Sequence, residues 1–209
     1  MDKKYWDEYY REHGLEQGIQ DESTFAFFCQ KKFLKYEQKK ILEIGSGNGR
    51  DARFFAKNNH NIIAVDQSHN GVTIYNDAHD NKIHYQENNF VKMEYNKFEN
   101  IDIVYSRFTL HAIQLEEENI VINKVYNLLN KDGMFMIEVR STKDPLYGVG
   151  EALEDNAYFT DHYRRFIDSS EFIKKVIEIG FKLVYFIEEN NLSIYKDDNP
   201  YLIRAILEK

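Results

Sequence analysis

The segment that most constrains the fold of this chain is ILEIGSGNGR, residues 41–50. An apolar run carries one acidic residue, Glu43, and ends in glycines at three alternate positions, followed by a helical stretch. Glycines at a strand-to-helix turn let the backbone approach a ligand without interference from a Cβ atom. The spacing is G-x-G-x-G, and Arg50 stands where a dinucleotide-binding G-x-G-x-x-G loop has its third glycine. The segment therefore predicts a ligand loop that does not cradle a pyrophosphate; the alternative is a tight turn that merely contains glycines.

Short apolar runs alternate with amphipathic stretches from residue 39 onward, which predicts parallel βαβ units. We expect strands at 41–44, 61–65, 83–85, 101–105 and 134–139, and helices at 51–57, 71–78 and 116–129. An irregular stretch at 141–166 precedes a helix at 169–179. The last strands, 181–188 and 200–207, have no helix between them and predict an antiparallel hairpin. The predicted fold is α/β: a Rossmann-like, seven-stranded, mostly parallel sheet with a C-terminal antiparallel hairpin and helices on both faces.

No repeat or Gly/Ser/Pro-rich linker divides the sequence, so we expect one main domain at 39–209. Residues 1–38 are polar and aromatic, with helical spacing in Tyr5, Trp6, Tyr9 and Tyr10. Binding surfaces use such rings, which keep one wet edge, so this segment is predicted to be a helical cap or lid over a cleft. Ordinary packing against the sheet is the alternative. The insertion at 141–166 is expected to form the substrate side.

A second motif lies at 61–66, where the apolar run NIIAV ends in Asp66. It follows the glycine loop by about 20 residues, the place where an acid can accept hydrogen bonds from the ribose hydroxyls of an adenosine. S-adenosylmethionine (SAM) contains an adenosine and no phosphate, and an acid beside the glycine loop suits its α-ammonium group. The two motifs together predict a SAM site.

Here the chain resembles the class I SAM-dependent methyltransferases, over residues 39–140 by motif and to the C-terminus by the order of elements. The resemblance implies SAM as cofactor and S-adenosylhomocysteine as product. It implies a cofactor site made of Glu43, Gly45, Ser46, Gly47, Gly49, Asp66, Gln67, Asn89, Phe90 and Ser106. Asn89 departs from the family, which often places a carboxylate there to hold adenine. The nucleic-acid amino-methylating tetrapeptide Asn/Asp-Pro-Pro-aromatic is absent from the fourth-strand segment 102–111, which argues against DNA base methylation.

Charge, hydropathy and cysteine content indicate which binding partners and which structural features the chain does not have. The chain has 35 acidic and 27 basic residues, so bulk charge does not draw it to nucleic acid. No apolar run approaches the roughly 20 residues of a membrane span. A single cysteine, Cys29, excludes an internal disulfide and a cysteine-based zinc cluster. We expect a cytoplasmic monomer or homodimer with no bound metal, membrane or nucleic acid.

Basic and aromatic residues gather in 138–148 and 161–166 against this acidic background. Arginine side chains bind phosphate or carboxylate through two parallel hydrogen bonds. The predicted acceptor-binding residues are Arg107, Arg140, Tyr147, Tyr163, Arg164 and Arg165. Ion pairing with Glu138, Asp144, Glu151 or Asp161 is the alternative. This segment and the N-terminal aromatics resemble small-molecule methyltransferases of capsule and surface-polysaccharide gene clusters, including phosphoramidate-methylating ones. That resemblance implies O-methylation of a small phosphate- or phosphoramidate-bearing acceptor in capsule biosynthesis.

The chemistry needs alignment of the acceptor with an activated methyl group and exclusion of water. A hydroxyl acceptor would also need a base, for which His111 and His162 are the candidates, whereas an anionic oxygen would need none. A structural role for either histidine is the alternative, and the other five histidines are expected on the surface. Two other functions remain open: methylation of a macromolecule such as tRNA or protein, and SAM binding without catalysis.

Overall fold

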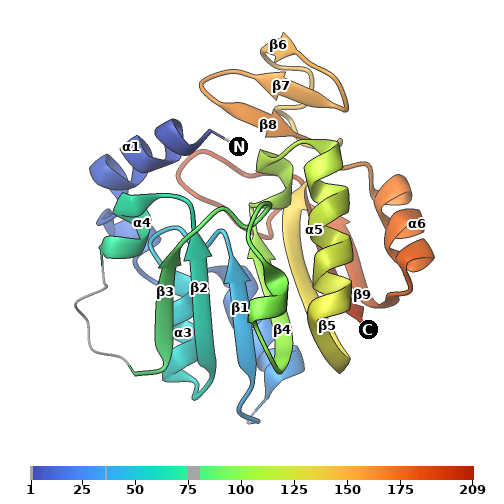
Figure 1. The fold of residues 1–209 in the computed structure, drawn as a ribbon. Helices are drawn as coiled ribbons and strands as arrows, with labels where there is room; N and C mark the ends of the chain where they lie inside the picture. Colours follow the sequence, from blue (N-terminus) through green and yellow to red (C-terminus); the bar gives the residue numbers. More distant parts are fainter. Residues whose placement is uncertain (1, 36, 75–80) are drawn as a thin grey trace.

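Seven strands form one sheet in the order β3-β2-β1-β4-β5-β10-β9 (Figure 1). The computed structural model describes residues 2–35, 37–74 and 81–209. The five strands from β3 to β5 are parallel, and β10 is antiparallel to both β5 and β9. The strands are β1 Lys40–Ile44, β2 Asn61–Asp66, β3 Ile83–Glu87, β4 Ile101–Arg107, β5 Leu129–Arg140, β9 Lys182–Glu189 and β10 Leu202–Glu208. The predicted fold class and its closing hairpin are confirmed.

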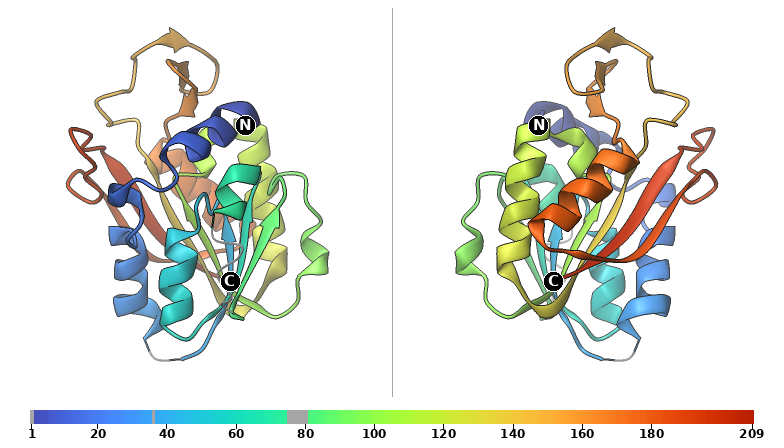
Figure 2. Two further views of the ribbon diagram at one scale, coloured as in Figure 1. Left: turned by 90° about the vertical axis from the view of Figure 1, so that its left-hand side faces the viewer. Right: turned by 90° about the vertical axis from the view of Figure 1, so that its right-hand side faces the viewer.

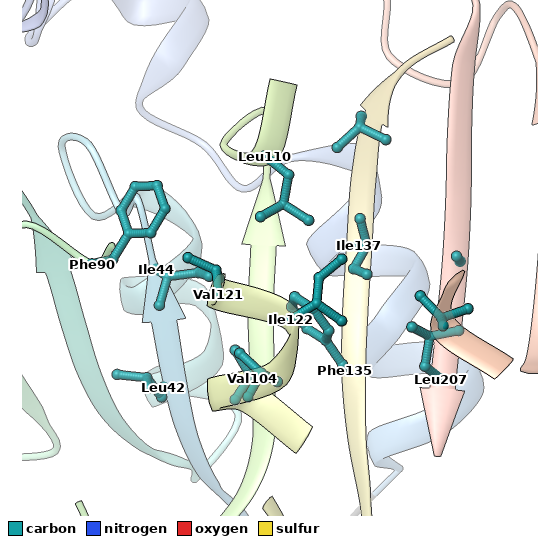
Figure 3. Packing of buried hydrophobic residues seen from close by; sticks show 14 of the residues in the cluster. Leu42, Ile44, Phe90, Val104, Leu110, Val121, Ile122, Phe135, Ile137 and Leu207 are labelled. Carbon is teal, nitrogen blue, oxygen red and sulfur yellow. The ribbon is translucent and has the colours of Figure 1, made fainter. Parts of the chain in front are cut away.

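Helices cover both faces of this sheet (Figure 2). One face carries α2 Thr24–Cys29 and α3 Arg50–Lys57, and the other carries α5 Leu115–Leu128 and α6 Ser169–Ile179. Alternation along the strands supplies a separate core to each face. In β5, for example, Phe135 and Ile137 join the core under α5 and α6 (Figure 3). Met136 between them joins the core under α2 and α3.

Helix α6 has a capping residue at each end. The side chain of Asp168 accepts from the backbone N–H groups of Ser170 and Glu171 and is the N-cap. Gly180 ends this helix with a left-handed φ of 117°. The helix predicted at 71–78 is α4 His69–Thr73; the remainder of that prediction, residues 75–78, lies outside the described residues.

The insertion predicted to be irregular contains a small three-stranded antiparallel sheet. Its strands are β6 Glu151–Ala152, β7 Ala157–Phe159 and β8 Tyr163–Arg165. Figure 1 shows this sheet beyond the carboxyl end of the large sheet, where α1 Lys3–His13 and α4 also lie. Short 3-10 helices at Gln17–Ile19, Tyr95–Lys97 and Leu110–Ala112, and a π-helix at Gln30–Leu34, complete the described elements.

The two N-terminal helices have different environments. Phe25, Ala26 and Cys29 of α2 are fully buried in the core of one sheet face, so this helix is an ordinary part of the domain. None of the residues of α1 is buried, and this helix lies across the carboxyl end of the sheet (Figure 1). Helix α2 therefore packs against the sheet, and the role of α1 as a lid stays a prediction.

The expectation that His60 lies on the surface is wrong. Its ring is fully buried, where Nδ1 accepts from the backbone N–H of Lys39 and Nε2 is 2.8 Å from Oε1 of Gln30. His79 lies outside the described residues. None of the described helices is long and apolar enough to cross a membrane.

Candidate functional site

A cavity of about 430 Å³ opens at the carboxyl end of the parallel strands. Ligands bind at this edge in open α/β sheets, and the volume lies in the range of small-molecule sites. The lining comes from α1, the glycine loop, the ends of β2, β4 and β5, the insertion, and the β9–β10 loop. Segments distant in sequence therefore converge on one site.

The glycine loop needs glycine for both conformation and space. Gly45, Gly47 and Gly49 have φ values of 73°, 55° and 70°, in the left-handed region. A Cβ on Gly45 would lie 2.5 Å from Oγ1 of Thr109, and one on Gly47 would lie 2.1 Å from the hydroxyl oxygen of Tyr10. The predicted loop is thus packed closely against the fourth-strand segment on one side and against α1 on the other.

Two carboxylates line the cavity beside this loop, as predicted. Asp66 accepts from the backbone N–H groups of Gly47 and Ser68, each at 2.8 Å, which fixes its position at the end of β2. Glu43 is 4% exposed, and its Oε2 has no hydrogen-bond partner among the described residues. Burial, with Asp51 and Asp66 nearby, raises the pKa of Glu43 well above its ordinary value. Such a group calls for a cationic partner.

Other buried polar atoms in the cavity also lack partners within the described chain. Ser46 Oγ and Gln67 Nε2 are buried without a hydrogen bond, and both residues line the cavity. Buried polar groups in native proteins are nearly always paired, so these atoms indicate a ligand with its own donors and acceptors. SAM fits this set, because its ammonium suits Glu43 and its ribose hydroxyls suit Asp66.

The structure does not bring every predicted cofactor residue to the cavity. Asn89 caps the following turn, where its Oδ1 accepts from the backbone N–H groups of Val91 and Lys92. Phe90 is fully buried in the core beneath β1 (Figure 3). Ser106 is buried, and neither it, Asn89 nor Phe90 is among the lining residues. Asn89 and Phe90 follow the end of β3 and Ser106 lies within β4, but none of their side chains reaches the cavity lining.

His111 and His162 both line the cavity, but neither is arranged as a base. Nδ1 of His111 accepts from the backbone N–H of Arg140 at 3.3 Å. Nε2 of His162 is 2.9 Å from Nη2 of Arg164, which can only donate. Burial lowers the pKa of each ring, and the nearby arginines lower it further. Both imidazoles are therefore neutral near pH 7 with their accepting nitrogen occupied, which contradicts the predicted role of general base.

Two of the predicted arginines line the cavity as members of ion pairs. Arg107 donates to Glu138 at 2.9 Å and to Ser193 Oγ at 2.7 Å. Arg140 pairs with both Asp144 and Asp198. The ion-pair alternative holds for these two guanidinium groups, although they remain at the surface of the cavity.

The adjacent arginines of β8 have opposite roles. Arg165 is 4% exposed, pairs with the buried Glu118, and donates to the backbone carbonyls of Leu110 and Ile113. Its predicted role in acceptor binding is therefore wrong. Arg164 lines the cavity and makes no ion pair within 4.0 Å in the described part of the chain. Burial and the charge of Arg140 lower the pKa of Arg164.

The two predicted tyrosines of the insertion lie outside the cavity lining. Tyr147 is 40% exposed, and its ring packs edge-on against Tyr158 and Phe166. Tyr163 is half-buried on β8. Both contribute to the small sheet and not to the cavity wall.

Sequence reasoning missed the contribution of the β9–β10 loop, which brings Ser193, Ile194, Tyr195 and Asp198 to the cavity. This loop is polar and without periodicity, so no sequence signal connects it to the site. Arg50, which follows the glycine loop, also lines the cavity beside Glu43. Its place at the loop was visible in the sequence and could have suggested it.

Side chains of helix α1 contact the protein on two sides of the cavity, at the end of β2 and at the insertion. Asp7 Oδ1 accepts from Ser68 Oγ and from the backbone N–H of Asn70, each at 2.9 Å, beside the end of β2. On the insertion side, the Tyr5 hydroxyl donates to Asp161 at 3.0 Å, and the Tyr5 ring stacks on His162 at 4.4 Å. Tyr10 is half-buried against the glycine loop, and desolvation raises its pKa.

Comparison with known proteins agrees with this geometry. Residues 42–137 match the family model described as a methyltransferase domain, which covers the glycine loop and the strands through β5. The chain has the class I SAM-dependent methyltransferase fold. This agrees with the predicted methyltransferase fold, and SAM is the cofactor of that class.

Two solved structures illustrate the likeness. The 1,6-didemethyltoxoflavin-N1-methyltransferase of Burkholderia thailandensis, with S-adenosylhomocysteine and its substrate bound, is 14% identical, with a TM-score of 0.71 over 97% of this chain and 84% of that one. A TehB-like SAM-dependent methyltransferase of Corynebacterium glutamicum is 15% identical, with a TM-score of 0.69 over 97% of each chain. At these identities the likeness concerns the fold.

A protein of Geobacillus sp. (strain WCH70) that bears a methyltransferase name is 28% identical over 122 residues. The match covers 55% of this chain, and it spans about half, 49%, of the length of that relative. The relative supports the domain class and leaves the acceptor open.

Proposed function

We propose that this protein transfers a methyl group from SAM to a small anionic acceptor. The observation that carries the proposal is that Glu43 and Arg164 line the same cavity. Oε2 of the buried Glu43 has no hydrogen-bond partner, and Arg164 has no carboxylate partner, within the described chain. When bound, SAM supplies an activated methyl group. The Burkholderia relative acts on a small molecule, which is consistent with this class of acceptor.

The residues of the cavity divide into two halves in this proposal. Glu43, Asp66 and the glycine loop hold the cofactor, with Ser46 and Gln67 as further polar partners. Arg164 and Arg140 orient the acceptor. Helix α1 acts as the lid that excludes water, because its rings cover the opening. The earlier predictions of O-methylation, a capsule role and a cytoplasmic location stay predictions from the sequence.

Methyl transfer to phosphorylated and carboxylated metabolites, measured with methyl-labelled SAM, tests the proposal. Arg164→Ala should lower kcat/KM for the acceptor by at least about tenfold, because a charge-assisted hydrogen bond is lost, while S-adenosylhomocysteine affinity stays within a few-fold. Lys143→Ala, in the same insertion but paired with Glu188 outside the cavity, is the matched control. Cofactor binding without transfer to any acceptor would contradict catalysis and favour a SAM-binding protein.

A further inference from the structure

The histidine nitrogens that could accept a proton from the substrate already accept hydrogen bonds from the protein. This limits which kind of substrate atom can be methylated. Because backbone N–H of Arg140 donates to Nδ1 of His111, the proton of this ring lies on Nε2. Because Arg164 donates to Nε2 of His162, the proton of that ring lies on Nδ1, 3.0 Å from Asp161 Oδ1 and without good hydrogen-bond geometry. His111 can offer its Nε2–H group to a ligand, whereas the Nδ1–H group of His162 is buried beside Asp161, and neither ring offers a free lone pair.

The acidic residues of the lining are also engaged. Asp51 accepts from Ser23 and from the Tyr105 hydroxyl, and Asp198 pairs with Arg140. Asp66 and Glu43 lie at the cofactor loop, and Glu22 is at the exposed rim. Burial raises the pKa of Tyr5, Tyr9 and Tyr10, which keeps these phenols protonated. Among the described lining residues, none on the acceptor side is placed to remove a proton from a neutral hydroxyl.

The positive charge in the same region needs a partner. Both guanidinium groups line the cavity, the charge of Arg140 disfavours that of Arg164, and of the two only Arg140 forms ion pairs within the described chain. A partly buried guanidinium beside a second one is stabilised by an anion that can accept its hydrogen bonds. The Nε2–H group of His111, which also lines the cavity, adds a further donor. The cavity is therefore built to hold an oxyanion.

We propose, resting on the methyltransferase function above, that the methylated atom is an oxygen of the anion that Arg164 binds. The acceptor is a small anion with at least two oxygens, such as a carboxylate or a phosphate. One oxygen accepts from Arg164, and a second oxygen carries the reacting lone pair. His111 acts as a positioning donor, and His162 holds Arg164 in place through the hydrogen bond that it accepts.

The step balances without a base. The oxygen lone pair forms the new O–C bond as the C–S bond of the sulfonium breaks, and the electrons of that bond stay on sulfur. The anion loses one negative charge, the sulfonium loses its positive charge, and no proton is released. Methylation of a neutral hydroxyl would release one proton per turnover.

Binding to the protein loaded with S-adenosylhomocysteine tests the anion site without turnover. Trp6 is the only tryptophan of the chain and lines the cavity, so its fluorescence reports occupancy. Phenyl phosphate and benzoate are the probes, with benzyl alcohol as the neutral match. We expect the anions to bind more tightly than the alcohol, and Arg164→Gln to weaken them by about tenfold or more. Lys143→Gln should bind as the wild type does.

The second measurement counts protons against methyl groups, with phenyl phosphate and benzoate as acceptors in a weakly buffered indicator solution. We expect a methyl ester without proton release, a rate that is flat between about pH 7 and 9, and retention of at least a tenth of it in His162→Gln. Methylation of benzyl alcohol, one proton per turnover, or failure of both anions to bind would overturn the inference. Methylation of benzyl alcohol or release of one proton, with the anions still bound, would leave the proposed function standing. Failure of both anions to bind would also remove the anionic acceptor from it, and loss of S-adenosylhomocysteine binding in the wild type would remove both proposals.

Discussion

At the residue scale, the buried carboxylate of Glu43 suits a cationic ligand but lowers the stability of the protein that has no ligand. Its carboxylate is buried, unpaired among the described residues and close to two other carboxylates. The pKa of Glu43 is therefore raised, so the folded protein binds this proton more tightly than the unfolded chain does. The folded state then loses stability as pH rises from the ordinary value of 4.5 toward the raised value.

Removal of this charge should stabilise the protein that has no cofactor. Glu43→Gln is expected to raise the free energy of unfolding at pH 8 by on the order of 1 kcal/mol, because a buried carboxylate no longer has to stay ionised. Urea unfolding of the wild type and the variant at pH 8 and pH 5 measures this, and the gain should shrink at pH 5. A loss of stability at pH 8 would show that Glu43 is satisfied in a way the structure does not show.

Cofactor affinity should have the opposite pH dependence. The α-ammonium binds ionised Glu43, so S-adenosylhomocysteine affinity should be complete above the raised pKa of Glu43 and fall as pH drops through it. Calorimetric titrations between pH 5 and 8 measure this. The pH dependence should largely disappear in Glu43→Gln, along with much of the affinity. An unchanged dependence in the variant would assign it to another group.

The sequence predicts some of these residues well and others poorly, for a geometric reason. Glu43 and Asp66 lie near the carboxyl ends of two parallel strands. Because these ends meet at one edge of the sheet, the sequence predicts that the two side chains lie close together. Arg164 and Arg165 look alike in the sequence. Successive residues of a strand point to opposite faces, so one reaches the cavity and the other reaches Glu118.

At the scale of elements, helix α1 lies over the cavity although none of its residues is buried in the core. It buries no residue completely, and it is held at the β2 side by Asp7 and at the insertion by Tyr5. An element held by few contacts opens more readily than one packed into a core. We expect its opening to control entry and exit of the cofactor.

Loss of the Asp7 contacts should therefore speed cofactor release. Asp7→Ala removes two hydrogen bonds, which predicts an increase of about fivefold to thirtyfold in the dissociation rate of S-adenosylhomocysteine. Stopped-flow fluorescence of Trp6 measures this rate. Glu8→Ala is the matched control, because Glu8 is the next residue of the same helix and is exposed. Equal rates in the Asp7 variant and the wild type would contradict the lid.

Elements with strong periodicity were predictable, and short ones were not. The parallel strands and α5 carry apolar patterns, and they appear close to the predicted bounds, except that β5 begins at Leu129, five residues before its predicted start. The strands β6, β7 and β8 have two or three residues each, too few for an alternating pattern. Their pairing depends on tertiary contacts, which local sequence does not encode.

At the scale of the whole molecule, one buried ionic group connects the sheet with the acceptor side. Glu138 of β5 is fully buried between Arg107 of β4 and Arg204 of β10. The two arginines also reach the β9–β10 loop, through Ser193 Oγ and the Leu192 carbonyl. The central sheet and a wall of the cavity therefore depend on the same carboxylate.

Deletion of that carboxylate should destabilise the fold strongly. Glu138→Ala leaves two buried guanidinium groups unpaired, which predicts a loss of about 3–5 kcal/mol in the free energy of unfolding. Urea unfolding measures the loss. Glu189→Ala, an exposed carboxylate at the end of β9, should change it by less than about 0.5 kcal/mol. Similar small changes in both variants would mean that the triad adds little to stability.

The central claim is that the glycine loop and Asp66 form a SAM site. Calorimetric titration of the purified protein with S-adenosylhomocysteine tests it most directly, with Asp66→Asn as the test variant and the exposed Asp21→Asn as its control. The account predicts saturable one-site binding by the wild type and Asp21→Asn, and a loss of affinity of at least about tenfold in folded Asp66→Asn. Absence of binding by the wild type, or equal binding by both variants, would contradict the account.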